Sequence, residues 1–160
     1  NEEGARVVEP LLASLPSPTV IVGALGSERA RPLIEVASRH ATPEEIRVLR
    51  DMVQADRKLI GNPDALSRAN RRFHKQIHLA SHNRFLVQQL DLVHRSMALL
   101  ATTSLAAEGR GAGALDEHQA IVTAIEAGDG DGADKAVREH ISKAFMPRLK
   151  LDAASVERNG

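Results

Sequence analysis

The sequence predicts an all-α fold, an antiparallel bundle of about six helices in which the last helix is kinked. Apolar residues recur at helical spacing from about residue 28 almost to the end of the chain, and no segment has the convincing alternating pattern of a strand. The chain has 160 residues, 42% of them hydrophobic, which suffices for one domain with a sizeable core. Only three residues are aromatic, all of them Phe, so aliphatic side chains are expected to fill this core.

The first three helices are predicted at about residues 28–40, from residue 43 onward, and at about residues 64–81. The second has the clearest beginning, because Thr42 is a good N-cap, Pro43 suits the first helical position and Glu45 completes a capping box. Asn62 and Pro63 separate the second helix from the third, since this dipeptide favours a turn.

The other three helices are predicted at about residues 83–108, at about residues 114–127 and from about residue 131 onward. The glycine-rich sequence EGRGAG is expected to end the fourth helix near Glu108, and Gly128 to end the fifth. Pro147 is expected to kink or interrupt the sixth, because proline lacks the N–H group that a helix interior requires.

The first 27 residues differ in composition from the rest of the chain. Proline stands at positions 10, 16 and 18 and glycine at positions 4, 23 and 26, and both residue types interrupt helices. We therefore expect residues 1–27 to be a linker or arm, and residues 28–160 to form the helical domain.

Charge and cysteine content narrow the classes of function. Lys plus Arg and Asp plus Glu both number 21, so no net charge attracts the chain to nucleic acid or to an anionic membrane. Without cysteine, neither a disulfide framework nor a thiolate metal site is available. No apolar run approaches the length of a membrane span and no signal-peptide pattern opens the chain, so we expect a cytoplasmic protein.

Three of the seven histidines lie in three different predicted helices: His74, His118 and His140. Neutral imidazole is a common metal ligand at physiological pH. Three such groups that converge inside a bundle would bind a first-row divalent metal and leave coordination positions open. Asn70, one helical turn before His74, could add an oxygen ligand.

The other histidines are expected to have ordinary structural roles, because a single histidine on a helix is usually a surface or hydrogen-bonded residue. His40 lies at a helix C-terminus, where positive charge is favourable, and His94 has no partner one turn away. His78 and His82 follow His74 at i+4 and i+8, and we expect both of them on the surface.

Several motifs carry a resemblance to a known family. They are Arg31-Pro-Leu-Ile-Glu35, NRRFHKQIHLASHN and DEHQAIVTAIEAGDGDGADKAVREH, and with the order between them they cover about residues 28–146. This ordered set resembles the FadR C-terminal domain (FCD) family, the effector-binding half of one large GntR subfamily of bacterial transcription regulators.

The resemblance implies a metal site. Its ligands would be the residues of this chain that match the family's ligand positions: Asn70, His74, His118 and His140. Asn70 departs from the usual Asp and brings no charge, so the site should be weakened but retained. Zinc or nickel is the expected metal. Glu117 and Glu139 are expected to face outward.

The resemblance also implies a small carboxylate effector above the metal. Arg31 matches an arginine of the first helix that could form bidentate hydrogen bonds to such an acid, and Arg95 is a weaker candidate for the same role. An ordinary helix-surface ion pair between Arg31 and Glu35 is an equally good explanation of this arginine.

Residues 4–10, GARVVEP, resemble the end of the wing in a GntR winged-helix domain. On this hypothesis residues 11–27 are the interdomain linker, and DNA binding belongs to a winged-helix domain that is absent from this chain. A disordered tail is the alternative. Family members are generally dimers, in keeping with two-fold operators, so a homodimer is expected.

These observations predict the ligand-sensing domain of a FadR-type GntR regulator that is not an enzyme. The alternative is a metal-dependent hydrolytic enzyme, because a metal on three histidines could activate water. No Glu-x-x-His or His-Glu-x-x-His motif supports this alternative. A helical scaffold without any ligand is the third possibility.

Overall fold

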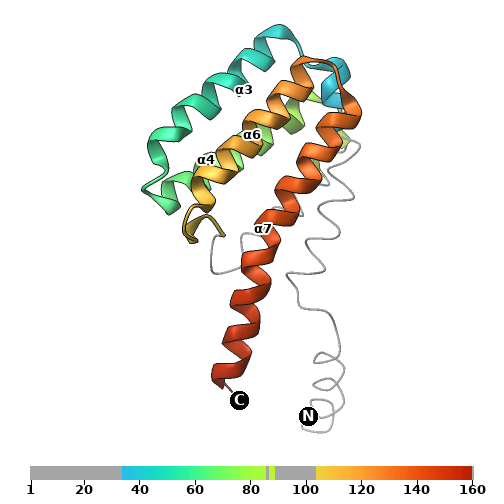
Figure 1. The fold of residues 1–160 in the computed structure, drawn as a ribbon. Coiled ribbons are helices and arrows are strands. Elements are labelled where there is room, and N and C mark those ends of the chain that lie inside the picture. The colour runs from blue at the N-terminus through green and yellow to red at the C-terminus, as the bar shows by residue number, and fades with distance from the viewer. Residues whose placement is uncertain (1–33, 86, 89–103, 160) are drawn as a thin grey trace, which may run out of the picture.

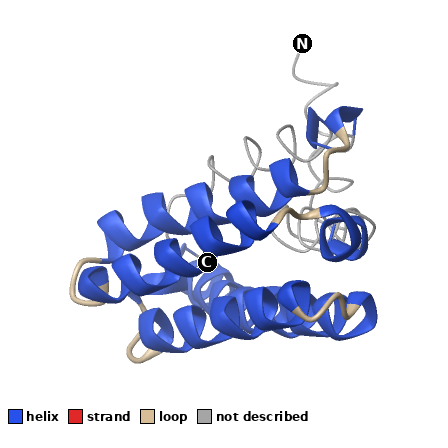
Figure 2. Cartoon of the chain, turned by 90° about the horizontal axis from the view of Figure 1, so that it is seen from above, coloured by secondary structure: helices blue, strands red, loops and turns tan. Residues whose placement is uncertain are grey.

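The computed structural model describes residues 34–85, 87–88 and 104–159, and from residue 146 onward it describes the backbone alone. In this part of the chain all the regular structure is helical (Figure 2). The α-helices with defined bounds are α3 (Pro43–Asp56), α4 (Pro63–Ala80), α6 (Arg110–Glu126) and α7 (Gly130–Asn159), and two short 3-10 helices are η1 (Arg57–Leu59) and η2 (Ser104–Ala106). The predicted all-α class is confirmed.

Within the described residues the number of helices is slightly below the predicted number of about six. Five α-helical segments are described without interruption, namely residues 34–40 together with α3, α4, α6 and α7. Residues 84–85 and 87–88 are helical as well, but residue 86 between them lies outside the described residues. Residues 1–33 and 89–103 also lie outside the described residues. The predicted arm, the wing-like sequence and His94 fall in these two ranges.

The beginnings of α3 and α4 follow from side-chain caps. Thr42 Oγ1 accepts a hydrogen bond from the Glu45 N–H at 3.2 Å, and Glu45 Oε2 accepts one from the Thr42 N–H at 2.9 Å. This reciprocal pair is the capping box that the sequence predicts. At the start of α4, Asn62 Oδ1 accepts from the Ala65 N–H at 3.0 Å, and Pro63 occupies the first turn.

The start of α6 differs from the prediction. The helix begins at Arg110, about one turn before the expected start near residue 114, and so includes Gly111 and Gly113. Gly111 is buried, and a Cβ atom on it would lie only 2.9 Å from Leu66 Cδ2 of α4. The glycine therefore permits close packing of two helices and does not break one, because its missing side chain leaves room for Leu66.

A tight connection joins α6 to α7. The Gly128 N–H donates to the Ile125 carbonyl at 3.0 Å and the Asp129 N–H donates to the Ala124 carbonyl at 3.0 Å, which is the Schellman pattern. Gly128 has φ 67°, a left-handed conformation that glycine adopts without strain. Gly128 thus ends α6 in the way the sequence predicts.

The last helix is not interrupted at Pro147, because α7 continues from Gly130 to Asn159. A proline in a helix interior removes one backbone hydrogen bond, and the turns on either side still propagate the helix. The predicted interruption of this helix at Pro147 is therefore wrong. The predicted kink stays a prediction. Figure 1 shows the C-terminal half of α7 extending beyond α3, α4 and α6.

The core lies where α6 packs against α3 and α7, and where α3 packs against α4 (Figure 1). Its larger cluster of buried residues comprises Ile34, Ala37, Leu49, Val53, Phe73, Ile77, Ile121, Val122, Ile125, Ala133 and Val137. A smaller cluster comprises Leu66, Leu105, Ala114 and Leu115. Along α6, position 118 therefore lies between Leu115 of the smaller cluster and Ile121 of the larger cluster.

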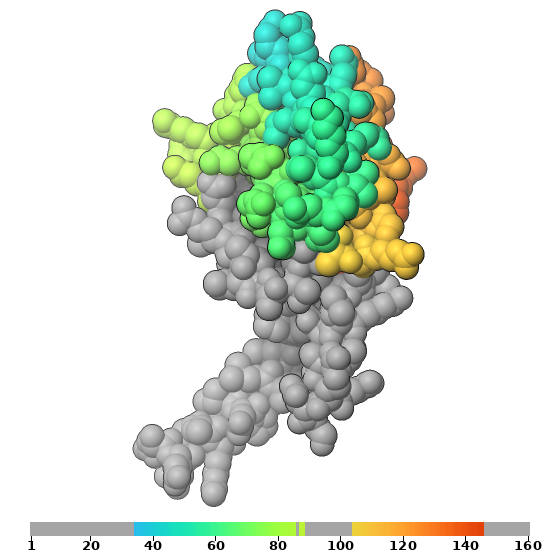
Figure 3. Space-filling view, turned by 90° about the vertical axis from the view of Figure 1, so that its left-hand side faces the viewer, coloured from blue at the N-terminus to red at the C-terminus, as the bar shows by residue number. Residues whose placement is uncertain are grey.

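On the face seen in Figure 3, α3 and α4 supply much of the described surface, and residues 84–85 and 87–88 protrude at one edge. Among the helices of the described ranges, none has both the length and the apolar character required to cross a membrane.

Candidate metal centre

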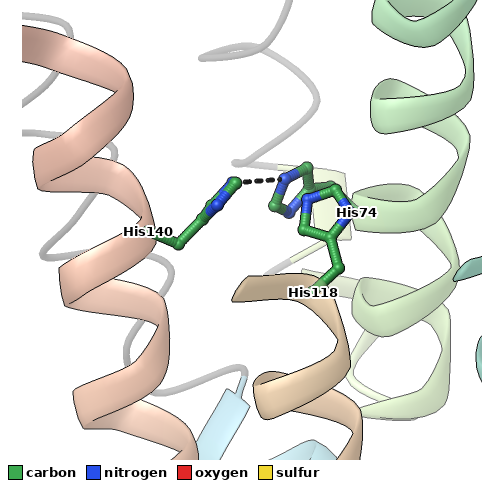
Figure 4. A group of neighbouring side chains, drawn as sticks. All are labelled: His74, His118 and His140. Carbon is green, nitrogen blue, oxygen red and sulfur yellow. Dashed lines mark hydrogen bonds between the residues drawn. The ribbon is translucent and has the colours of Figure 1, made fainter. Parts of the chain in front are cut away.

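Three imidazole rings from three helices meet in the interior. His74 of α4, His118 of α6 and His140 of α7 point toward one another in Figure 4. The ring centroids are 5.2 Å apart for His74 and His118, 5.0 Å for His74 and His140, and 4.7 Å for His118 and His140. One ring nitrogen of each residue lies within 4.8 Å of those of the other two. The three histidines could therefore hold a metal ion.

Helix packing determines where these rings lie. His118 is 1% exposed and stacks on Phe73 of α4, with the ring centroids 4.1 Å apart and the planes inclined by 20°. His140 is 4% exposed and lies one turn after the core residue Val137, while His74 directly follows Phe73 and is half-buried. The apolar faces of α4, α6 and α7 thus bring the imidazoles together.

Burial also controls the charge of His118. Loss of contact with water lowers its pKa well below the usual histidine value, and the nearby His140 and Arg110 lower it further. His118 is therefore neutral at physiological pH, with a lone pair on one ring nitrogen. Neither of its ring nitrogens has a hydrogen-bond partner among the described residues. A buried, unpartnered imidazole beside two others fits a metal ion, because coordination would satisfy that lone pair.

His140 is held on both sides of its ring. Its Nδ1 donates to Glu117 Oε2 at 2.8 Å, and its Nε2 lies 3.1 Å from His74 Nε2. Glu117 Oε2 also accepts from Arg110 Nη2 at 2.8 Å, and Lys143 Nζ lies 3.5 Å from Glu117 Oε1. The ring of His140 consequently has a defined orientation.

Glu117 is ionised in this setting. Burial alone would raise its pKa, but the hydrogen bonds from His140 and Arg110 and the charge of Arg110 lower the pKa below the usual glutamate value. The predicted outward orientation of Glu117 is wrong, since its side chain is only 11% exposed. A sequence signal exists, because Arg110 precedes Glu117 by two helical turns and therefore shares its face. Glu139 is exposed, as expected.

The line of histidines that follows His74 does not lie on one exposed face. His78 is buried, at 3% exposure, so its predicted surface position is wrong. His82 is exposed but lies after the end of α4, in the left-handed region with φ 54°, and its Nε2 is 3.0 Å from Glu45 Oε1. His40 is exposed at the end of its helix, as expected.

The other predicted site residues are less well defined by the structure. Asn70 is half-buried on α4, one turn before His74, which places it on the same side of the helix. Its role as a metal ligand stays a prediction. Arg31 and Arg95 lie outside the described residues.

Comparison with known proteins finds a family model and curated relatives that match this chain. Residues 31–143 match the family model of the FCD domain. Over 120 residues the chain is 34% identical to proteins of Escherichia coli (strain K12) and Shigella flexneri that are named for regulation of the L-lactate dehydrogenase operon. The match covers 72% of this chain and 46% of each relative, so the chain spans about half the length of the curated relatives it matches.

Solved structures share the fold at low sequence identity. E. coli McbR/YncC has a TM-score of 0.71 at 14% identity, covering 81% of this chain and 64% of that one. Streptococcus agalactiae GntR has a TM-score of 0.69 at 18% identity, covering 84% and 62%. A metal-free FCD domain of a protein described as a transcriptional regulator has a TM-score of 0.60 at 15% identity, covering 83% and 89%. At these identities the similarity concerns the fold alone.

Proposed function

Because this chain belongs to the FCD domain family of GntR-type transcription regulators, we propose that it senses a small organic acid beside a histidine-bound divalent metal. The observation that carries the proposal is the convergence of three buried or half-buried imidazoles, one of them with both ring nitrogens unpartnered among the described residues. The family is one of regulators and not of enzymes, so the hydrolytic alternative is not favoured.

In this proposal His74, His118 and His140 hold the metal, and Asn70 adds its amide oxygen. Imidazole nitrogens without thiolates suit zinc or nickel. The ring nitrogens that would hold the metal lie within 4.8 Å of one another. The metal would supply positive charge that attracts a carboxylate.

The arginines would give the acid its orientation. A guanidinium pairs with a carboxylate through two parallel hydrogen bonds, and Arg31 or Arg95 would provide it. The relatives that are 34% identical are named for an L-lactate dehydrogenase operon, so L-lactate belongs among the acids to be tested.

The proposal also includes a boundary between residues 27 and 28, which separates the linker from the helical domain, and a cytoplasmic location.

Regulation would follow from a change in the relative stability of two arrangements of the helices. An acid that binds one arrangement more tightly shifts the population toward it, and this would reposition winged-helix domains on the DNA. A homodimer would match a two-fold operator. GntR-family regulators bind DNA through an N-terminal domain, and we assign that domain to the part of the whole protein outside these residues.

Metal analysis and ligand-induced stabilisation test the proposal. The purified wild-type chain should contain about one divalent metal, and the triple variant His74→Ala, His118→Ala, His140→Ala should contain none. Small mono- and dicarboxylates should raise the Tm of the metal-loaded wild type, because a ligand that binds the folded state stabilises it. Arg31→Ala should keep its metal and lose this stabilisation. Equal metal content in the triple variant would contradict the metal site, and full stabilisation of Arg31→Ala would remove the role of Arg31.

A further inference from the structure

We propose that Glu117 is a positioning residue that prepares His140 to bind a metal through Nε2. This inference rests on the proposed metal site, and it assigns a role to a carboxylate outside the predicted ligand set. The side chains of His140, Glu117 and Arg110 form a continuous buried chain, with exposures of 6%, 11% and 9%. Arg110 and His140 both donate to the same carboxylate oxygen, each at 2.8 Å.

The carboxylate selects one tautomer of His140. A carboxylate oxygen accepts hydrogen bonds, and Glu117 Oε2 lies 2.8 Å from His140 Nδ1, so Nδ1 is the ring nitrogen that carries the donated proton. The lone pair is then on Nε2, the nitrogen that lies 3.1 Å from His74 Nε2 and faces the other imidazoles (Figure 4). A histidine that binds a metal through one nitrogen usually donates from the other to a carboxylate or carbonyl, which orients the ring and strengthens it as a ligand.

Arg110 and Lys143 explain why the carboxylate remains in place. Arg110 binds it through a buried ion pair, and the ammonium group of Lys143 lies 3.5 Å from its other oxygen. Since Arg110 and Glu117 are both on α6, the carboxylate is anchored to one helix while it contacts His140 on another. Glu117 thereby fixes the ring of α7 relative to His118 of α6.

The test is a titration of the full chain with Zn²⁺ in the presence of a competing chelator. Glu117→Gln keeps the volume of the side chain but removes the constraint, because the amide can donate to Nδ1 or accept from it. We expect this variant to bind Zn²⁺ about 10- to 100-fold more weakly, the usual loss when the partner of a metal-binding histidine is removed. Glu139→Gln, the same change at the exposed residue next to His140, is the matched control and should bind as the wild type does.

A fourth protein, His74→Ala, separates failure of this inference from failure of the metal site. If His74→Ala binds Zn²⁺ as tightly as the wild type, the three-histidine site is wrong and the role of Glu117 falls with it. If His74→Ala binds weakly while Glu117→Gln matches the wild type, the metal site stands and the positioning role of Glu117 is overturned. The Tm of each metal-free variant shows whether a loss of affinity accompanies a loss of folding.

A spectroscopic measurement on the wild type decides the matter even if Glu117→Gln does not fold. A long-range ¹H–¹⁵N spectrum of the metal-free protein distinguishes protonated from unprotonated ring nitrogens, and His140→Gln identifies the signals of His140. We expect a protonated Nδ1 and an unprotonated Nε2. A His140 ring protonated at Nε2 and free at Nδ1 would overturn the proposal.

Discussion

His140 and His82 each interact with a glutamate at nearly the same distance, but their surroundings differ. The distance from His140 Nδ1 to Glu117 Oε2 is 2.8 Å, and the side chains are 6% and 11% exposed. The distance from His82 Nε2 to Glu45 Oε1 is 3.0 Å, and the exposures are 51% and 24%. The first pair lies between α6 and α7 beside two further imidazoles, whereas the second links the residues after α4 to the first turn of α3.

The difference teaches that burial, more than distance, decides what such a pair can do. Exposed ion pairs contribute about 0–1 kcal/mol, because water and salt screen them. Removing one partner of a buried pair costs about 3–5 kcal/mol, because the other partner is left uncompensated. Glu117 is therefore expected to have consequences for the site, and Glu45 to act mainly as part of a helix cap.

The largest expected contrast concerns metal binding. His140→Ala should weaken Zn²⁺ binding by about a thousandfold, or about 4 kcal/mol, because two imidazoles remain where three converged. His82→Ala removes the same side chain from the exposed pair and should leave the affinity unchanged. Chelator competition measures both values. A similar loss in the two variants would show that the buried and exposed histidines do not differ in this respect.

The next contrast concerns the stability of the metal-free protein. Glu117→Ala should lower the free energy of unfolding by about 3 kcal/mol, because Arg110 and His140 lose a buried acceptor. Glu45→Ala should lower it by only about 1 kcal/mol, the typical value of a helix cap. Urea unfolding gives both numbers. Equal losses would mean that burial adds nothing to the pair.

A second carboxylate introduced near the buried histidines would sharpen the comparison. Asn70→Asp should strengthen metal binding by about tenfold, or about 1.4 kcal/mol, less the cost of desolvating the new charge. Asn62→Asp, at the exposed N-cap of the same helix, is the control and should not change metal affinity. Equal or weaker binding by Asn70→Asp would exclude Asn70 as a ligand and favour a role in binding the effector or a metal-bound water.

The smallest effect is the pH dependence of the exposed pair. Burial alone would raise the pKa of Glu45, but hydrogen bonds with Thr42 and His82 lower it below the usual glutamate value. A carboxyl group with a lowered pKa in the folded state stabilises the protein above its unfolded pKa, and this contribution disappears as the pH falls through the folded value. The wild type should thus exceed Glu45→Gln in stability by less than about 1 kcal/mol at pH 7, and the difference should vanish in acid. Thermal unfolding between pH 7 and pH 3 checks this, and a difference independent of pH would contradict it.

Features that depend on a single helical turn could be predicted from the sequence. The capping box at Thr42 and Glu45 and the glycine end of α6 at Gly128 involve residues only a few positions apart. Their hydrogen bonds require no knowledge of distant segments. The three histidines could also be named in advance, because each interrupts the apolar face of its own helix and because the family resemblance points to the same positions.

Features that depend on contacts between helices could not be predicted from the sequence. Gly111 reads as a helix breaker until Leu66 of α4 is placed against it. Glu117 and His78 read as surface residues, because polar side chains usually are, and only the packing of neighbouring helices places them inside. The order of residues along one helix does not reveal which neighbour covers each face.

The tight connection between α6 and α7 has a consequence for how the site forms during folding. His118 and His140 belong to a helical hairpin closed by a few residues around Gly128, so little loop entropy opposes their meeting. His74 belongs to α4, which is distant in sequence and docks only when long-range contacts form. Because local contacts form fastest, we expect His118 and His140 to come together early in folding and His74 to join them later, when α4 docks. A metal bound by all three histidines would then link α4 to the hairpin and slow the dissociation of α4 from it.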